Sequence, residues 1–300
     1  MSHTLIRQIP MLGGCIEAVE INKGYSSDEK YRIHMREGNR LLLRLFDVAE
    51  LEGRKEEFSA MARLQDIGVS CSRPVSIGVA EGRGYMVTSY IEGDDGEVAI
   101  PACSDGEQYN LGVEAGKELG KMHQLAAPEH VDPWHVRKTE KHRNYIDAYL
   151  ECGVKVKDDQ KIMKFIDDNI HLMEGRPNLF QHDDFHPGNI IVNNGKFAGA
   201  IDFNRYDWGD PVHDFLKIGI FTRGVSIPFS IGQIRGYFNG EEPDEKFWRL
   251  YSLYLAMCVF SSVVWAQRAD PDGLDGMLEK VYLYLEDHDC FEMVKPKWYQ

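Results

Sequence analysis

The residues best suited to chemistry lie in the stretch FQHDDFHPGNIIV, from Phe180 to Val192. Residues 182–189 alone hold two histidines, two aspartates and an asparagine. Such side chains ligate metals, and they also act as acids, bases and magnesium ligands in enzymes. The stretch is therefore either a metal site built from its two histidines or a catalytic loop in which only some of these residues react.

A zinc site would use His182 and His186, which are four residues apart. That spacing places two side chains on one face of a helix. Pro187 and Gly188 follow at once, however, and the flanking residues are typical of strands, so a helix is disfavoured here. The stretch also has no H-E-x-x-H motif. We therefore disfavour zinc.

The spacing of the acidic residues favours the second interpretation. Asn189 follows Asp184 by five residues, and Asp202 comes after a further apolar strand. This pattern resembles the catalytic loop and the metal-binding aspartate of the protein-kinase fold. Phosphoryl transfer needs a carboxylate near the acceptor hydroxyl and oxygen ligands that hold Mg²⁺ beside the phosphates. The alternative is that the aspartates are solvated and that Asn189 only caps a turn.

The elements that must position these residues divide the chain in two. Before residue 92 the pattern predicts strands, with hairpin turns at 37–39 and 81–84 and one helix within 48–68. Helical periodicity dominates the later part, interrupted by a β-hairpin that turns at 194–195. We expect an α+β protein with a nucleotide-binding lobe at 1–91, an acidic, turn-rich hinge or linker at 92–107, and a catalytic and substrate-binding lobe at 108–300.

A kinase-like site also needs groups that hold ATP upstream of the loop. The segment INKGYSSDEKYRI offers Gly24, Ser26 and Ser27, whose small size lets backbone N–H groups approach phosphate. Arg44 is a lone charge inside an apolar strand, and Glu57 lies on the inward side of the following helix. Each feature alone is typical of solvated side chains, but their order along the chain favours a nucleotide site.

Together these motifs resemble the aminoglycoside phosphotransferase-like kinases, a family that includes antibiotic kinases and choline-kinase-type metabolite kinases. The resemblance covers almost the whole chain. HDDFHPGN is similar to the family's H-G-D-x-H-P-G-N loop, and AIDFNRYDWGDPVHDF to its I-D-F/W segment followed by G-D-P-x-x-D. The segments similar to its nucleotide loop, basic strand, hinge and helix ending in L-x-x-L-H are GYSSDEKYRI, LLLRL, GYMVTSYIEG and AGKELGKMHQL.

The resemblance implies a bilobal protein-kinase-like fold, with a small β-rich N-lobe and a larger, mostly helical C-lobe. It also implies ATP and Mg²⁺ as cofactors and a small-molecule hydroxyl as acceptor. Asp184 would be the catalytic base, Asn189 and Asp202 would bind Mg²⁺, and His182 would brace the loop. The implied cofactor-binding residues are Gly24, Ser26, Ser27, Arg44, Glu57 and, through the hinge backbone against adenine, Thr88, Ser89, Tyr90 and Ile91.

Three positions depart from the pattern. Arg44 stands where protein kinases use lysine, and the two are not equivalent as phosphate ligands. Asp183 replaces the usual glycine of the loop, and its role stays unassigned at this stage. Asn204 stands at the glycine position of D-F-G and no A-P-E motif follows, which disfavours a protein kinase. Asp210 and Asp214, by the resemblance, would stabilise the lobe around the loop.

Composition limits the partners and the compartment. The net charge of −14 disfavours a nucleic-acid binder, which needs a basic surface. Six singly placed cysteines, with no C-x-x-C pair, are typical of a reducing compartment. The start has no signal-peptide core, and the apolar run LYLAMCVFSSVVW of 13 residues is too short to span a bilayer. We expect a cytoplasmic monomer or dimer without a membrane partner.

The acceptor is the least determined feature. Acidic groups in EGDDGE, DGLDG and LEDHDC would suit a cationic aminoglycoside, although solvated turns are the more ordinary reading. From the resemblance we expect a kinase most like an aminoglycoside phosphotransferase, an antibiotic kinase; a choline, homoserine or sugar kinase, or a macrolide kinase, is the alternative. A catalytically silent regulatory nucleotide-binding protein is the alternative outside enzymes. The aromatic residues that could line an apolar or quaternary ammonium pocket, but whose helical spacing is more typical of a core, are Phe247, Trp248, Tyr251, Tyr254, Trp265, Tyr282 and Tyr284.

Overall fold

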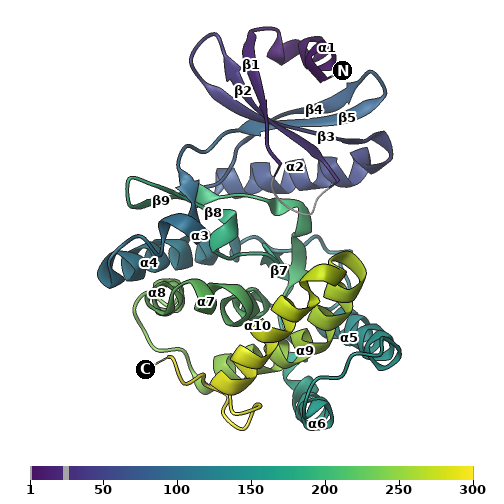
Figure 1. The fold of residues 1–300 in the computed structure, drawn as a ribbon, viewed down its shortest axis with the longest axis vertical. Coiled ribbons are helices and arrows are strands. Elements are labelled where there is room, and N and C mark those ends of the chain that lie inside the picture. Colours follow the sequence, from purple (N-terminus) through teal and green to yellow (C-terminus); the bar gives the residue numbers. More distant parts are fainter. Residues whose placement is uncertain (1, 23–26, 300) are drawn as a thin grey trace.

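The computed structural model describes residues 2–22 and 27–299 and has two lobes (Figure 1). A β-sheet lobe is formed by the N-terminal part of the chain, and a mostly helical lobe by the C-terminal part. Each lobe has its own cluster of buried apolar side chains. The predicted α+β fold with two unequal lobes is therefore confirmed.

The N-terminal sheet has five antiparallel strands in the order β1-β2-β3-β5-β4. Both predicted hairpins are present, and a glycine with positive φ stands in each turn: Gly38 at +89° between β2 and β3, and Gly82 at +77° between β4 and β5. The short helix α1 precedes the sheet. The bounds are α1 Ser2–Gln8, β1 Cys15–Glu20, β2 Glu29–Met35, β3 Arg40–Asp47, β4 Pro74–Ala80 and β5 Arg83–Ser89.

Helix α2, Leu51–Asp66, lies along the side of the sheet that faces the helical lobe (Figure 1). Gly68, with φ +77°, follows its end as predicted. Glu57 is buried on the same face as Met61 and Leu64, as predicted, while Ile67 is 37% exposed. A carboxylate on the buried face needs a cationic partner, and the strand beside it supplies one.

The segment 92–107 is folded rather than extended. It contains the two-residue strand β6, Asp94–Asp95, and the helical turn α3, Gly96–Ala99, and α4 begins within it. β6 pairs with β8 of the helical lobe. This segment is therefore held against the hairpin that follows the catalytic loop.

Two helices of the C-terminal lobe approach each other unusually closely. A Cβ atom at Gly116 of α4 would lie 2.0 Å from the carbonyl oxygen of Gln233 on α8, and one at Gly232 would lie 2.1 Å from that of Tyr109. Larger side chains would force the helices apart. The bounds of the lobe's helices are α4 Asp105–Met122, α5 Trp134–Glu151, α6 Asp159–Asn169, α7 Arg223–Val225, α8 Ile227–Tyr237, α9 Glu245–Ala269 and α10 Leu274–Asp287.

Helix α9 is the core element of this lobe and packs against α5, α6 and α10. Within residues 2–22 and 27–299 it is the one helix long and apolar enough to cross a membrane, and 83% of its apolar window is buried in the protein. The prediction that the 13-residue run LYLAMCVFSSVVW is too short to span a bilayer was wrong about length, because the helix of 25 residues extends beyond this run at both ends. Its burial assigns it to the core.

Short strands flank the loop that contains the polar residues 182–189. β7, Leu179–Gln181, leads into the loop and pairs with β10, Asp207–Gly209. The predicted hairpin follows as β8, Ile190–Asn193, and β9, Lys196–Ala200. Residues 182–189 therefore lie between two strands and contain no α-helix.

Candidate active site

His182 ties the loop to the strand that follows the hairpin. Its ring is fully buried, and its Nε2 lies 3.0 Å from the carbonyl oxygen of Ile201. Burial lowers the pKa of His182, so the ring is neutral at pH 7 and Nε2 donates to that carbonyl. In the described part of the chain, no group of three or more His, Cys, Asp or Glu side chains could hold a metal ion.

The carboxylate of Asp214 holds the backbone at the start of the loop. Its carboxylate accepts the backbone N–H groups of His182 at 2.9 Å and Asp183 at 2.7 Å, and His123 Nε2 lies 3.0 Å away. Asp214 is fully buried, so these contacts satisfy a charge that would otherwise be costly. Asp183 has a φ of +56°, a strained value for a non-glycine residue that this pair of hydrogen bonds helps to hold.

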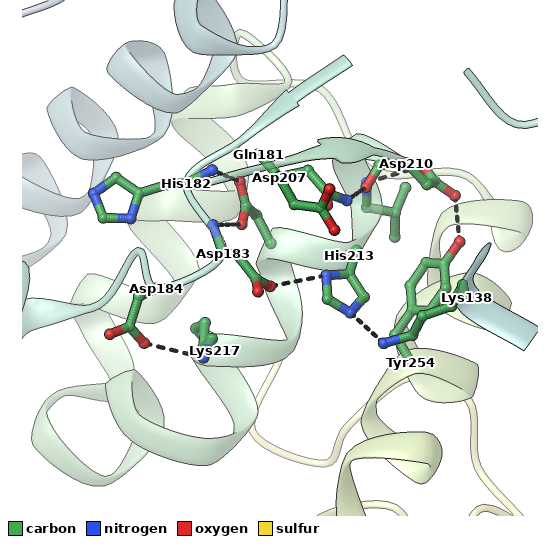
Figure 2. Close-up of polar contacts among 12 residues, drawn as sticks. Lys138, Gln181, His182, Asp183, Asp184, Asp207, Asp210, His213, Lys217 and Tyr254 are labelled. Atoms are coloured by element: carbon green, nitrogen blue, oxygen red, sulfur yellow. Dashed lines mark hydrogen bonds and ion pairs between the residues drawn. The ribbon is translucent and has the colours of Figure 1, made fainter. Parts of the chain in front are cut away.

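Asp210 braces the lobe in a similar way. Arg176 donates to both of its carboxylate oxygens at 2.7 Å, and the hydroxyl of Tyr254 donates at 2.7 Å. Asp210 is fully buried, and Figure 2 shows it on the far side of the loop from Asp184. Neither Asp210 nor Asp214 lines the cavity described below.

Asp184 points from the loop toward Lys217 (Figure 2). Lys217 Nζ lies 3.0 Å from its Oδ1, and Asn189 Nδ2 donates to its Oδ2 at 3.2 Å. Burial opposes ionisation of Asp184, but the hydrogen bond from His186 and the charge of Lys217 hold its pKa well below the usual range. Asp184 is therefore an ionised acceptor at neutral pH, with a fifth of its side chain exposed.

Asn189 and Asp202 offer oxygen atoms beside Asp184. The amide nitrogen of Asn189 donates to the backbone and the side chain of Asp184, which leaves its amide oxygen for another ligand. Asp202 follows β9 with a φ of +66°, and both residues line the same cavity as Asp184. One amide and one carboxylate oxygen, completed by phosphate and water, fit Mg²⁺.

Asp183 turns away from Asp184 and belongs to a second chain of contacts (Figure 2). Its Oδ1 lies 3.3 Å from His213 Nδ1, and Lys138 Nζ lies 2.7 Å from His213 Nε2. Burial opposes ionisation of Asp183, but the nearby His213 ring and the charges of Lys217 and Lys141 hold its pKa well below the usual range. Asp183 thus orients His213, which in turn holds Lys138.

Arg44 is buried in the N-terminal lobe between two carboxylates. Its Nη1 donates to Glu57 at 2.6 Å and its Nε to Asp28 at 2.8 Å. Arg54 also reaches both carboxylates, at 2.8 Å to Asp28 and 3.3 Å to Glu57. Burial disfavours the charged guanidinium, but Glu57 and Asp28 more than offset it and raise the pKa of Arg44. The predicted Arg44–Glu57 pair is present, and Asp28 is a third member that sequence reasoning missed.

The predicted hinge offers two features suited to a base. The N–H groups of Ser89 and Tyr90 are bonded to strand carbonyls, whereas that of Ile91 has no acceptor among the described residues. Thr88 is 3% exposed, and its hydroxyl has no hydrogen-bond partner within residues 2–22 and 27–299. A buried, unpaired hydroxyl and an open N–H group leave polar contacts for a ligand.

A cavity of about 990 Å³ opens beside the catalytic loop, and among the described residues Ser27 is the one from the N-terminal lobe that lines it. The structure brings Asp184, Asn189, Asp202 and Ser27 together on its wall. Arg44, Glu57 and the hinge residues 88–91 are not among the described residues that line it. Gly24 and Ser26 lie outside the described residues.

Sequence reasoning also missed the basic residues of the cavity. Lys138 and Lys141 come from α5, and His213 and Lys217 from the segment after the loop. The available signal was the α5 run VRKTEKHRNY, in which basic residues three and four apart share one helix face. Nothing local in the run shows that this face looks onto the loop.

The family and the fold agree with this geometry. The profile of the phosphotransferase enzyme family, APH, matches residues 17–251. No curated protein matches the sequence significantly. The GDP complex of an aminoglycoside 2′-phosphotransferase-IIIa mutant is 13% identical, with a TM-score of 0.71, and the match covers 98% of this chain and 99% of that one.

Two further solved structures share the fold. A choline/ethanolamine kinase family protein from Mesorhizobium loti is 17% identical with a TM-score of 0.69, covering 98% of this chain and 96% of that one. The streptomycin–ATP–APH(2″)-IIa ternary complex is 17% identical with a TM-score of 0.65, covering 94% and 97%. At these identities the structures show a common fold and no common substrate. From the family match over most of its length, the chain belongs to the phosphotransferase enzyme family and is a small-molecule kinase.

Proposed function

We propose that the protein transfers the γ-phosphoryl group of ATP to a hydroxyl of a small molecule, with Asp184 as the base. In this reaction the acceptor oxygen forms a bond to the γ-phosphorus, the bond from that phosphorus to the bridging oxygen breaks, and ADP leaves. The hydroxyl proton passes to Asp184. Because the pKa of Asp184 is low, its main work is to orient the hydroxyl, and the proton moves late.

The observation that carries this proposal is the convergence of Asp184, Asn189 and Asp202 on one cavity beside the catalytic loop. They come from a loop and from the end of a hairpin, and Lys217 and Asn189 hold the carboxylate of Asp184 in place. A solvated turn would not need this set of contacts. The same arrangement disfavours the silent regulatory protein, which has no use for an oriented base.

For the cofactors we propose ATP and Mg²⁺. Asn189 and Asp202 would hold the metal, which when bound neutralises charge on the transferring phosphate. Thr88 and Ile91 leave polar groups for adenine at the hinge. One structural neighbour is an ATP complex and another an ADP complex, which supports a nucleotide here. Arg44 is not among the described residues that line the cavity, and it would contribute by holding the buried network with Glu57.

The acceptor class is not decided by these relatives, because they include both aminoglycoside and choline/ethanolamine kinases. The sequence-based choice of an aminoglycoside, and with it antibiotic resistance, stays a prediction. A cytoplasmic location is likewise proposed, supported by six cysteines that are all free. Monomer and dimer both stay open.

The experiment is an ADP-release assay with Mg·ATP across aminoglycosides, macrolides, choline, hydroxy amino acids and sugars, followed by mass spectrometry of the product. We expect at least one acceptor to gain the mass of a phosphoryl group. Asp184→Asn should still bind Mg·ATP but lose turnover. Retention of turnover in that variant, or nucleotide binding without turnover on any acceptor, would contradict the proposal.

A further inference from the structure

The acceptor side of the cavity is lined by basic residues. Lys138, Lys141, His142 and Tyr145 occupy positions i, i+3, i+4 and i+7 of α5 and all line it. Lys280 of α10 lines it as well. Asp183 of the catalytic loop contacts His213, and His213 in turn contacts Lys138 (Figure 2). The α5 side of the cavity therefore carries a cluster of basic side chains, while the carboxylates that line the same cavity are Glu97, Asp183, Asp184, Asp202 and Asp270.

These charges are not neutralised by the protein. Within the described ranges, Lys138, Lys141, Lys280 and Arg205 form no ion pair with a carboxylate, although all four line the cavity. Lys138 instead contacts the imidazole of His213, and its Nζ lies 5.7 Å from the ring centre of Trp134. Burial and the neighbouring Lys141 lower the pKa of Lys138 to about 8. The charges of Asp183 and Asp207 oppose this shift but do not cancel it, so a bound anion would stabilise the charged lysine further.

His142 is a second side chain of the cavity with a polar atom open to a bound molecule. It is 8% exposed, and its Nδ1 has no hydrogen-bond partner among the described residues. Burial and the charge of Lys138 lower its pKa to about 4, so the ring is neutral at pH 7. A neutral, unpaired ring nitrogen on the cavity wall leaves a polar contact for a bound molecule.

The acidic residues expected to attract a cation lie elsewhere. Of the carboxylates in EGDDGE, DGLDG and LEDHDC, Glu97 alone among the described residues lines the cavity. Asp287, for example, is buried in a two-bond pair with Arg223. Of the aromatic residues considered for a quaternary ammonium pocket, Trp265 lines the cavity. Asp270, which follows the same helix, lines it as well. For the other carboxylates of these stretches, the position outside the cavity agrees with the more ordinary interpretation as solvated turns and a helix end.

The charge of this basic cluster is opposite to that of the whole protein. The chain carries −14, so a basic cluster is not a general property of its surface. A polycation would have to approach two unpaired lysines, whereas an anion would be attracted to them and would stabilise their charged form.

We infer that the acceptor is a hydroxylated organic anion whose carboxylate or phosphate ester is bound by Lys138 and Lys141 while its hydroxyl faces Asp184. The inference rests on the proposed function, since it concerns the acceptor of the same reaction. Asp183, through His213, is the positioning residue for Lys138. Lys217 is different, because it pairs with Asp184 and so contacts the reacting end.

The test uses the double variant Lys138→Met/Lys141→Met, with Lys246→Met as control, since Lys246 is an exposed lysine outside the cavity. Protein saturated with Mg·AMP-PNP, which occupies the nucleotide site, is titrated with inorganic phosphate and, separately, with kanamycin in a thermal-shift assay. We expect phosphate to raise the Tm of the wild type and of Lys246→Met but not of the double variant. A rise with kanamycin and none with phosphate would overturn the inference.

The kinetic arm compares gluconate, glucose 6-phosphate, glucose, glucosamine and kanamycin as acceptors in the ADP-release assay. For an anionic acceptor, the double variant should raise KM about tenfold or more, as expected for loss of charge-assisted contacts, and leave the KM for Mg·ATP within about twofold. An effect on Mg·ATP alone would mean that the lysines serve the γ-phosphate. Turnover of kanamycin that the double variant does not change would contradict the anionic acceptor but agree with kinase activity. Phosphate binding without turnover on any acceptor would contradict the proposed function but agree with an anion site at the lysines.

Discussion

In the N-terminal lobe two arginines share two buried carboxylates, whereas in the C-terminal lobe two lysines face the cavity and, among the described residues, have no carboxylate partner. Arg44 is bonded to Asp28 and Glu57 at 2.8 and 2.6 Å. Lys138 contacts the imidazole of His213 and lies near the ring of Trp134, and the charge of Asp183 acts on both lysines without forming an ion pair with either among the described residues. Charges that the protein neutralises itself stabilise the fold, and charges that it leaves open are available to a ligand.

The largest effect should come from breaking the closed network. Arg44→Met removes the hydrogen bonds of Arg44 to the buried Asp28 and Glu57, so we expect the free energy of unfolding to fall by about 3–5 kcal/mol, measured by urea denaturation. Lys141→Met should change it by less than about 0.5 kcal/mol, because it also relieves repulsion of Lys138. Equal losses in the two variants would remove the contrast between the lobes.

The next effect concerns the metal. Asp202→Asn keeps the shape of the side chain and removes its charge, so we expect the Mg²⁺ concentration for half-maximal turnover to rise about 10- to 100-fold. The measurement is turnover against Mg²⁺ at fixed ATP. Asp207→Asn, a change on the nearby strand β10 outside the cavity, is the matched control. An unchanged Mg²⁺ requirement in Asp202→Asn would argue against its role as ligand.

The open lysine should make acceptor binding depend on pH. The pKa of Lys138 is about 8 in the folded protein against 10.5 normally, so the lysine is charged below pH 8 and neutral above it. The KM of an anionic acceptor should therefore be constant below pH 8 and rise by up to about tenfold per pH unit above it. The same depressed pKa makes unfolding harder as pH rises from 8 toward 10.5, because the unfolded chain binds the extra proton.

The measurement is acceptor KM from pH 6.5 to 9.5, with Lys138→Met as control. That variant should show no step near pH 8. An identical profile in the variant would assign the step to another group. The charged or titratable groups that face Lys138 from neighbouring elements are Lys141, Asp183, Asp207, His213 and Cys258.

The smallest expected effect belongs to Asp183. Asp183→Asn weakens the hold on His213 and so on Lys138, which should raise acceptor KM about fivefold, as for a net loss near 1 kcal/mol, with Mg·ATP binding unchanged. Asp183→Glu, which keeps the charge, should recover part of the loss. A fall in kcat larger than the rise in KM would place Asp183 in the reaction itself.

Much of the fold and half of the site could be predicted because the signals are local. The hairpin turns need residues that accept positive φ, and Gly38 and Gly82 provide them within a few residues of the strands they join. The proposed base Asp184 and the proposed metal ligand Asn189 lie in one loop, so their spacing alone brings them together.

The acceptor wall could not be predicted because it depends on packing between distant segments. Lys138 meets His213 across 75 positions of sequence, and only the docking of α5 beside the catalytic loop makes that contact. Asp28 is similar, since it joins Arg44 and Arg54 from a position that reads as part of a solvated turn. The position of the lysines in space, which the sequence does not show, is the basis on which we infer an anionic rather than a cationic acceptor.

The most direct test of the account is the rate of the chemical step in Asp184→Asn beside its neighbour Asp183→Asn. Each variant, with bound Mg·ATP, is mixed with an acceptor turned over by the wild type, and the phosphorylated product is followed by rapid quench in a single turnover. We predict a fall of about 10³-fold for Asp184→Asn and less than tenfold for Asp183→Asn. Equal rates for Asp184→Asn and the wild type, or a larger fall for Asp183→Asn, would contradict the assignment of Asp184 as the base.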